Sequence, residues 1–255
     1  MGNGYLPGWQ QPDMEISVPS GHAVAGVSVG IIVIDVRYPF LPGNVANAST
    51  FEYPVMHRVL RGASAEQIMS GDPALLAPII EAGTCLIEHG ARCIVGACGS
   101  FAYFQSEVAA ALGVPTFLSV MLQAPLLIHS LKPDQKLGVI AASPAALTEA
   151  VFEQCGIADP TRLVITGAKG LSEFDRLLAC EGRFNSRKLE SELVKHVLDF
   201  VARHPEVGAL LVQCSDLPPY SWAIQNATGL PVFDMTTLID YAHAGLVRRP
   251  FAGFV

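Results

Sequence analysis

Two cysteines in this 255-residue chain occupy positions that favour thiol chemistry. Cys98 follows the apolar run 93–95 and lies in the small-residue turn GACGS, and Cys214 follows the apolar run 210–212 in the stretch LLVQCSD. Each cysteine therefore ends a predicted buried strand and precedes a predicted helix. Free backbone N–H groups and the helix dipole favour a thiolate at such a position, and the same N–H groups can bind a carboxylate.

The surroundings of the two cysteines repeat along the chain. Cys98 is followed after 15 residues by the glycine of a Gly-Val-Pro sequence at 113–115, and Cys214 after 15 residues by that of Gly-Leu-Pro at 229–231. The simplest interpretation is two similar halves related by a pseudo-twofold axis, each presenting one thiol to a shared cleft. Two thiols on opposite sides of one carbon could invert that carbon, one removing a proton and the other returning one.

The elements that must position these cysteines alternate between strands and helices. Near-continuous apolar runs predict buried parallel strands at 27–34, 92–96, 115–120, 137–142, 162–166, 209–213 and 231–233. Helices are expected between them, the clearest being amphipathic over 186–204. The fold class is therefore α/β, with two similar flavodoxin-like parallel-sheet domains at 26–134 and 135–234 and a cleft between them. Residues 1–25 are expected to form a loose N-terminal arm.

Composition and motifs exclude several function classes. The net charge is −7 and no run of basic residues occurs, so nucleic acid is not an expected partner. Apolar stretches are too short to span a membrane, and residues 1–25 lack the pattern of a signal peptide, so a cytoplasmic protein with reduced thiols is expected. No C-x-x-C, H-x-x-H or G-x-G-x-x-G pattern occurs, which argues against a metal site and a nicotinamide cofactor. A homodimer is the default assembly.

The segments around both cysteines resemble those of the aspartate/glutamate racemase superfamily. The resemblance is carried by GACGSFAYFQSEVAAALGVPTFLSVMLQ, by VQCSDLPPYSWAIQNATGLPVFDMTTLIDY and by GIIVIDVRYPFLPGNVANASTFEYPV. It covers about residues 26–250. It implies a two-domain enzyme that needs no cofactor, pyridoxal phosphate included, and that takes one catalytic cysteine from each half. It also implies that residues 235–255 pack back onto the first domain.

The resemblance also assigns candidate site residues. Cys98 and Cys214 match the catalytic thiols. Binding of a substrate carboxylate is implied for residues that follow them, and a weaker substrate-site match falls in the loop after the first strand; these candidates are Gly99, Ser100, Ser215, Asn44 and Asn47. The remaining cysteines are interpreted as packing residues: Cys85, Cys93, Cys155 and Cys180.

One departure from the superfamily pattern concerns the substrate. Asp216 stands where well-known amino-acid racemases have His or Glu, and it could assist the thiol, hold a substrate ammonium or repel a dicarboxylate. The sequence-based hypothesis is a racemase or epimerase that acts beside the carboxylate of a small molecule, first of all an aspartate- or glutamate-like amino acid. The alternatives are a hydantoin racemase, a maleate-type cis–trans isomerase and a carboxylate-binding protein without catalysis. A decarboxylase is disfavoured, because that class typically keeps only the second cysteine.

Overall fold

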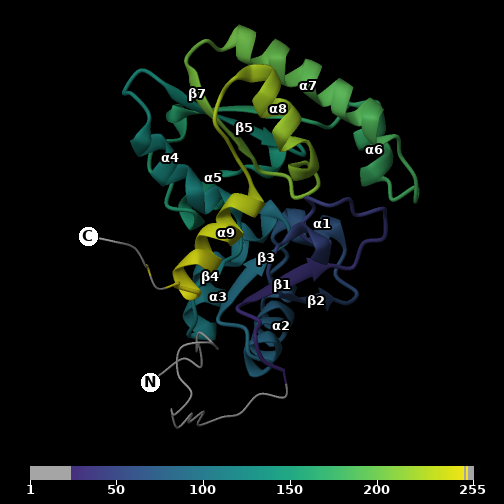
Figure 1. Ribbon diagram of the computed structural model, residues 1–255, viewed down its shortest axis with the longest axis vertical. Helices are drawn as coiled ribbons and strands as arrows, with labels where there is room; N and C mark the ends of the chain where they lie inside the picture. Colours follow the sequence, from purple (N-terminus) through teal and green to yellow (C-terminus); the bar gives the residue numbers. More distant parts are fainter. Residues whose placement is uncertain (1–23, 250, 252–255) are drawn as a thin grey trace.

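The chain forms two parallel β-sheets, each of four strands. The computed structural model describes residues 24–249 and residue 251, so the arm expected at 1–25 lies, except for its last two residues, outside the described residues (Figure 1). The first sheet has the order β2-β1-β3-β4, with β1 (Val29–Ile34), β2 (Val55–Leu60), β3 (Cys93–Gly96) and β4 (Thr116–Phe117). The second has the order β6-β5-β7-β8, with β5 (Lys136–Ala141), β6 (Leu163–Gly167), β7 (Val207–Val212) and β8 (Val232–Phe233).

The two sheets repeat one topology. All six strand pairings are parallel, and in each sheet the strand that comes first in the sequence lies between the second and the third. β3 and β7 therefore occupy equivalent places, and each carries a candidate cysteine just beyond its carboxyl end. The predicted fold class, two similar α/β units with parallel sheets, is confirmed.

Helices connect the strands and cover the sheets. They are α1 (Ala65–Ser70), α2 (Leu76–Glu88), α3 (Gln105–Leu112), α4 (Ala124–Ser130), α5 (Glu149–Gln154), α6 (Ser172–Leu178), α7 (Ser186–Arg203), α8 (Ser221–Thr228) and α9 (Met235–Leu246). The amphipathic helix expected at 186–204 is α7, which begins after the cap Asn185 and buries Leu189, Leu193, Val197 and Phe200. Within the described part of the chain, no helix is both long and apolar enough to cross a membrane.

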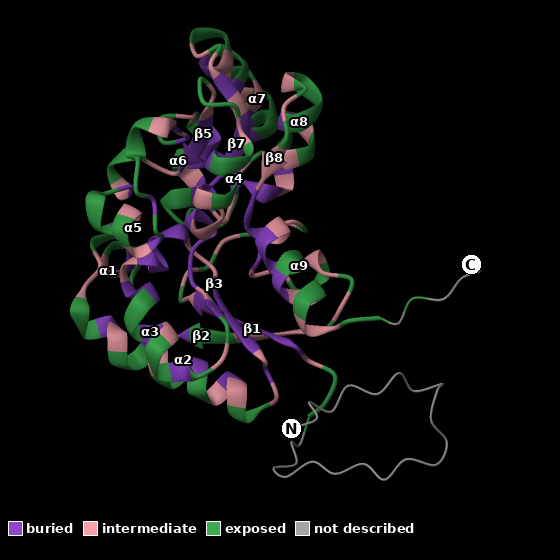
Figure 2. Ribbon diagram, turned by 90° about the vertical axis from the view of Figure 1, so that its left-hand side faces the viewer, coloured by how far each residue is buried: buried purple, intermediate pink, exposed green. Residues whose placement is uncertain are grey.

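Strand β2 was not among the predicted strands. It lies at the edge of the first sheet, and most of its side chains are half-buried or exposed, including those of His57 and Arg58. An edge strand needs no continuous apolar run, so the pattern that reveals buried parallel strands does not reveal this one. The inner strands β1 and β3, in contrast, are almost entirely buried (Figure 2).

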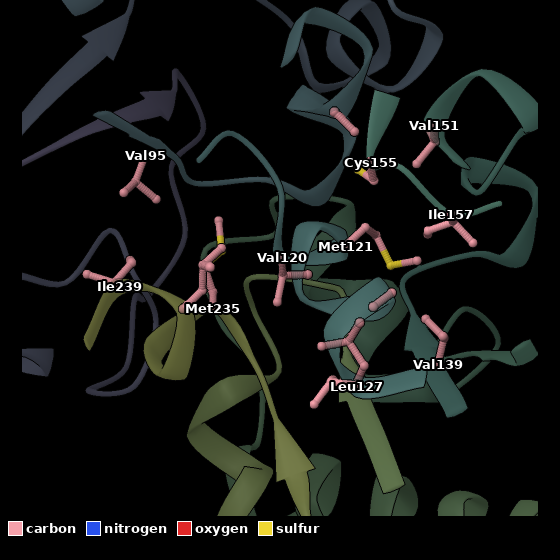
Figure 3. Packing of buried hydrophobic residues seen from close by; sticks show 14 of the residues in the cluster. Val95, Val120, Met121, Leu127, Val139, Val151, Cys155, Ile157, Met235 and Ile239 are labelled. Carbon is pink, nitrogen blue, oxygen red and sulfur yellow. The ribbon is translucent and has the colours of Figure 1, made fainter. Parts of the chain in front are cut away.

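We call the β1–β4 sheet with its connecting helices the first half of the protein, and the β5–β8 sheet with its connecting helices the second half. One hydrophobic cluster contains residues from both halves and joins them. Val95 and Val120 from the first half and Val139 from the second belong to one buried cluster, together with Met235 and Ile239 of α9 (Figure 3). Because interiors pack at the density of organic crystals, a core shared in this way holds the two halves in one arrangement. The position of each candidate cysteine relative to the other therefore depends on this cluster.

Helix α9 follows the second sheet in sequence but packs against the first half (Figure 1). The Oγ atom of Ser28 lies 2.8 Å from Nδ1 of His243, and the hydroxyl of Tyr53 donates to Asp240 at 2.6 Å. The ring of Tyr53 also stacks on His243, with ring centroids 3.5 Å apart. The chain therefore returns to its first half after β8.

A substitution in α9 tests how strongly this return stabilises the protein. Ile239 is fully buried in the shared core, so we expect Ile239→Ala to lower the free energy of unfolding by about 2–4 kcal/mol in urea titrations. Tyr241 lies on the same helix and is 69% exposed, so Tyr241→Ala should change that free energy by no more than about 0.5 kcal/mol. Equal effects of the two substitutions would contradict the described packing of α9.

Candidate active site

A cavity of about 380 Å³ lies between the two halves, beyond the carboxyl ends of β1, β3, β5 and β7. Ligands bind at this edge in open parallel sheets. The first half contributes Tyr38, Phe40, Asn44 and residues 98–100 to the lining, and the second half contributes Ser143, Lys169 and residues 213–216. Cys98 and Cys214 thus line one cavity from opposite halves, and both are free thiols.

Two contacts join the chain segments that flank the two cysteines. The hydroxyl of Ser215, just after Cys214, donates to the carbonyl of Ala97, just before Cys98, at 2.9 Å. Conversely, Gly99 packs so closely on Gln213 that a Cβ atom on the glycine would lie 2.0 Å from the amide nitrogen of Gln213. We call these two contacts the seam. A side chain at position 99 would require the Gln213 side chain to move and would also press on the backbone carbonyl of Gln213, 2.9 Å from the added Cβ atom.

The thiols are not predisposed to ionise. The pKa of Cys98 is raised to about 11, chiefly by burial; hydrogen bonds from Ser100 partly offset this increase, and the charge of Asp216 adds to it. Burial, followed by the charge of Asp216, raises the pKa of Cys214 well above its ordinary value. The expectation that helix N-termini favour thiolates here is therefore wrong. The helix that follows Cys98 is a short 3-10 segment, Gly99–Phe104, and its few N–H groups do not outweigh the loss of solvent.

Asp216 lies at the centre of a polar cluster. Its Oδ1 atom accepts hydrogen bonds from the hydroxyl of Tyr38 at 2.5 Å and from the side-chain amide of Asn44 at 2.7 Å. The thiol of Cys214 points at its Oδ2 atom from 3.8 Å. Burial raises the pKa of Asp216, and these three donors act in the opposite direction. Because all three partners donate, the arrangement matches an ionised carboxylate, which can only accept.

Two of the predicted substrate-binding side chains have structural partners instead. Asn47 does not line the cavity: its amide donates to the carbonyl of Phe40 at 2.9 Å, and its oxygen accepts from the backbone of Ser49. It therefore fixes the loop that carries Phe40 and Asn44. The hydroxyl proton of Ser215 is engaged in the seam, although this residue does line the cavity. Gly99, Ser100, Asn44 and Asp216 lie in the lining as predicted.

The sequence interpretation missed several lining residues, namely Tyr38, Phe40, Ser143, Lys169 and Gln213. Their common feature is that each lies shortly after the carboxyl end of a strand. Strand ends could therefore have revealed them, whereas residue type alone could not. Within the described residues, no three His, Cys, Asp or Glu side chains are grouped as a metal site would require.

Comparison with solved structures establishes the fold. A crystal structure of arylmalonate decarboxylase aligns with a TM-score of 0.55 and 16% identity, covering 88% of this chain and 94% of that protein. An aspartate racemase homologue from Pyrococcus horikoshii aligns with a TM-score of 0.53 and 15% identity, covering 85% of this chain and 99% of that protein. At such low identity the likeness concerns architecture alone. A scan against protein-family models finds no match.

Curated relatives are more similar in sequence. "Dimethylsulfoniopropionate lyase 3" of Emiliania huxleyi (strain CCMP1516) is 33% identical over 236 residues, which is 89% of this chain and 61% of that protein. "Dimethylsulfoniopropionate lyase" of Durusdinium sp. clade D is 30% identical over 233 residues, which is 89% of this chain and 77% of that protein. The chain thus spans about three fifths of the Emiliania huxleyi relative and three quarters of the Durusdinium relative.

These relatives correct the expected activity. The hypothesis of a racemase or epimerase is wrong, because the curated proteins that match most of this chain are lyases. The fold implied by the superfamily resemblance is confirmed, because an aspartate racemase homologue shares the two-sheet architecture. With 30% identity over more than two thirds of the Durusdinium protein, the chain belongs to the dimethylsulfoniopropionate lyase family.

Proposed function

We propose that this protein is a lyase that eliminates dimethyl sulfide from dimethylsulfoniopropionate. The observation that carries the proposal is the meeting of Cys98 and Cys214 in one cavity of a chain whose curated relatives are named for this activity. The substrate carries a carboxylate at one end and a dimethylsulfonium group at the other. A base beside its carboxylate-bearing carbon is what the reaction requires.

The elimination balances with one thiolate as the base. A thiolate of the Cys98–Cys214 pair takes a proton from the carbon next to the carboxylate, and the electron pair of that C–H bond forms a carbon–carbon double bond. The bond between the neighbouring carbon and sulfur breaks, and its electrons leave with the sulfur. The products are neutral dimethyl sulfide, acrylate and a neutral thiol. The single negative charge passes from the thiolate to the product, because the substrate is a zwitterion with no net charge.

A racemase-like scaffold suits this reaction because the first step is shared. Racemisation and elimination both begin with removal of a proton next to a carboxylate, and both place negative charge on that carboxylate. Gly99 and Ser100, which follow Cys98, line this wall of the cavity, and donors at this wall would stabilise such charge. Dimethylsulfoniopropionate has no stereocentre but has a leaving group on the next carbon, so loss of the proton leads to elimination.

Alanine substitutions of the two cysteines test the base. Wild-type protein should release dimethyl sulfide, measured by headspace gas chromatography, together with equimolar acrylate, measured by proton NMR. We expect Cys98→Ala and Cys214→Ala both to lower kcat/KM, and the substitution that removes the base to do so by roughly 10²–10⁴-fold. Cys85→Ala is the matched control, since Cys85 lies on α2 outside the cavity lining. Failure of the wild type to release dimethyl sulfide, or full activity in both variants, would contradict the proposal.

The raised thiol pKa values predict the pH dependence. Below the pKa of Cys98, about 11, the thiolate fraction of the free enzyme falls about tenfold for each unit of pH. The pKa of Cys214 is also raised, so kcat/KM should increase with pH whichever of the two cysteines is the base. We expect kcat/KM to rise about tenfold per unit from pH 7 to pH 9, with circular dichroism confirming an intact fold throughout. If kcat/KM did not change with pH over this range, a thiol that ionises without help from another group could not be the base.

A further inference from the structure

We propose that Asp216 and the rings of Tyr38 and Phe40 form a subsite for a fully alkylated cation, so that the cavity selects sulfonium and quaternary ammonium carboxylates. We call these three residues the onium subsite. The inference deepens the proposed function and rests on it for the identity of the natural substrate. What the inference adds is the class of ligand that the cavity binds, and binding measurements can test this without any turnover.

Among the residues that the structure describes, none forms an ion pair with Asp216. The groups that shift its pKa are all neutral donors: Tyr38, Asn44 and Cys214. A carboxylate withdrawn from bulk water is costly unless a cation compensates it. Because Asp216 lines the cavity, a ligand in the cavity can supply the missing positive charge.

The hydrogen-bonding pattern favours a cation without N–H or S–H groups. Three donors already occupy the oxygens of Asp216, two on Oδ1 and one facing Oδ2, whereas a carboxylate has about four acceptor positions. A primary ammonium could therefore place only one of its N–H groups on Asp216 without displacing a donor, and its other N–H groups would lose their hydrogen bonds to water. A methylated sulfonium or ammonium group needs only charge and apolar contact, so the existing hydrogen bonds can remain in place.

Two aromatic residues line the cavity together with this carboxylate, and one of them, Tyr38, contacts it. The centroids of Tyr38 and Phe40 are 4.6 Å apart with an angle of 47° between the ring planes, and both rings line the cavity. Aromatic rings attract alkylated cations through the ring quadrupole and bury their methyl groups. The hydrogen bond from Tyr38 to Asp216 fixes one ring, and the bond from Asn47 to the carbonyl of Phe40 fixes the backbone of the other.

The rest of the lining is complementary to the other end of such a ligand. Lys169 and Asp216 are the charged side chains among the described residues that line the cavity. A zwitterion with a cation at one end and a carboxylate at the other can therefore pair with both.

Occupation of the onium subsite also affects the thiols. The charge of Asp216 is one of the causes that raise the pKa of Cys98 and of Cys214. A cation bound at Asp216 offsets this charge and lowers both thiol pKa values, so the substrate assists formation of the base that attacks it. The pH profile of kcat, which reports the enzyme–substrate complex, should accordingly lie at lower pH than the profile of kcat/KM.

Calorimetry with two unreactive ligands of the same shape tests the subsite. The first is 3-(trimethylammonio)propanoate, whose amine is a much poorer leaving group than dimethyl sulfide, and the second is 4,4-dimethylpentanoate, in which carbon replaces the charged nitrogen. We expect the wild-type protein to bind the cationic ligand at least roughly tenfold more tightly. Asp216→Asn should abolish this preference, because it removes the charge and keeps the size of the side chain.

Matched variants separate the subsite from general damage to the fold. Asp240 also accepts a hydrogen bond from a tyrosine but does not line the cavity, so Asp240→Asn should keep the preference intact. Phe40→Leu provides a second test that leaves the carboxylate in place. It should reduce the preference for the cationic ligand, but less than Asp216→Asn does. Equal affinity of the wild type for the two ligands, or an undiminished preference in Asp216→Asn, would overturn the inference.

The outcome can be distinguished from that of the proposed function. Preferential binding of the cationic ligand that depends on Asp216, without release of dimethyl sulfide from dimethylsulfoniopropionate, would support the subsite and reject the proposed reaction. Release of dimethyl sulfide by a wild type that binds both ligands equally would support the reaction and reject the subsite. Failure of the wild type to bind either ligand would overturn the inference, whatever the result of the activity assay.

Discussion

The close contact between residues 97–99 and 213–215 is the constraint on which the site depends. Each half supplies a strand end, a cysteine and one partner of each seam contact, so neither half can build the cavity alone. The shared core around Met121 and Val139 holds the two sheets behind this seam. Positioning within fractions of an ångström is what acid–base chemistry requires, and packed interiors supply it.

Loss of solvent dominates the electrostatics of the cavity. Two thiols and one carboxylate are brought together where water is scarce, so burial raises the pKa of all three, and the charge of Asp216 adds to the increase at both thiols. The protein places neutral donors around these groups, Ser100 at Cys98 and both Tyr38 and Asn44 at Asp216, and no cation of the described residues contributes to the pKa shift of either group, although Lys169 lines the same cavity. Such a site is poorly suited to an anionic ligand with two carboxylates and well suited to one that carries a positive charge.

Much of the architecture could be predicted from the sequence, because buried parallel strands leave an apolar signal. Seven strands were expected near their observed places, and the equal spacing after Cys98 and Cys214 revealed the internal repeat. Strand β2 escaped because an edge strand lacks that signal. The thiol pKa values had the opposite direction from that expected, since desolvation depends on the assembled cavity rather than on the neighbours of a cysteine in sequence. The activity was misjudged because the leaving group that distinguishes elimination from inversion belongs to the substrate.

The return of α9 to the first half determines how the two halves can move. The chain passes between the halves after β4 and again after β8, and Gln123 at the first passage donates to the carbonyl of Asp234 at the second, at 3.0 Å. The hydroxyl of Thr237 donates to Gln123 as well. Two chain crossings bonded side by side, together with the shared core, restrict twisting and sliding of one half against the other. The two cysteine-bearing strand ends therefore keep their register, and the thiols keep their relative positions.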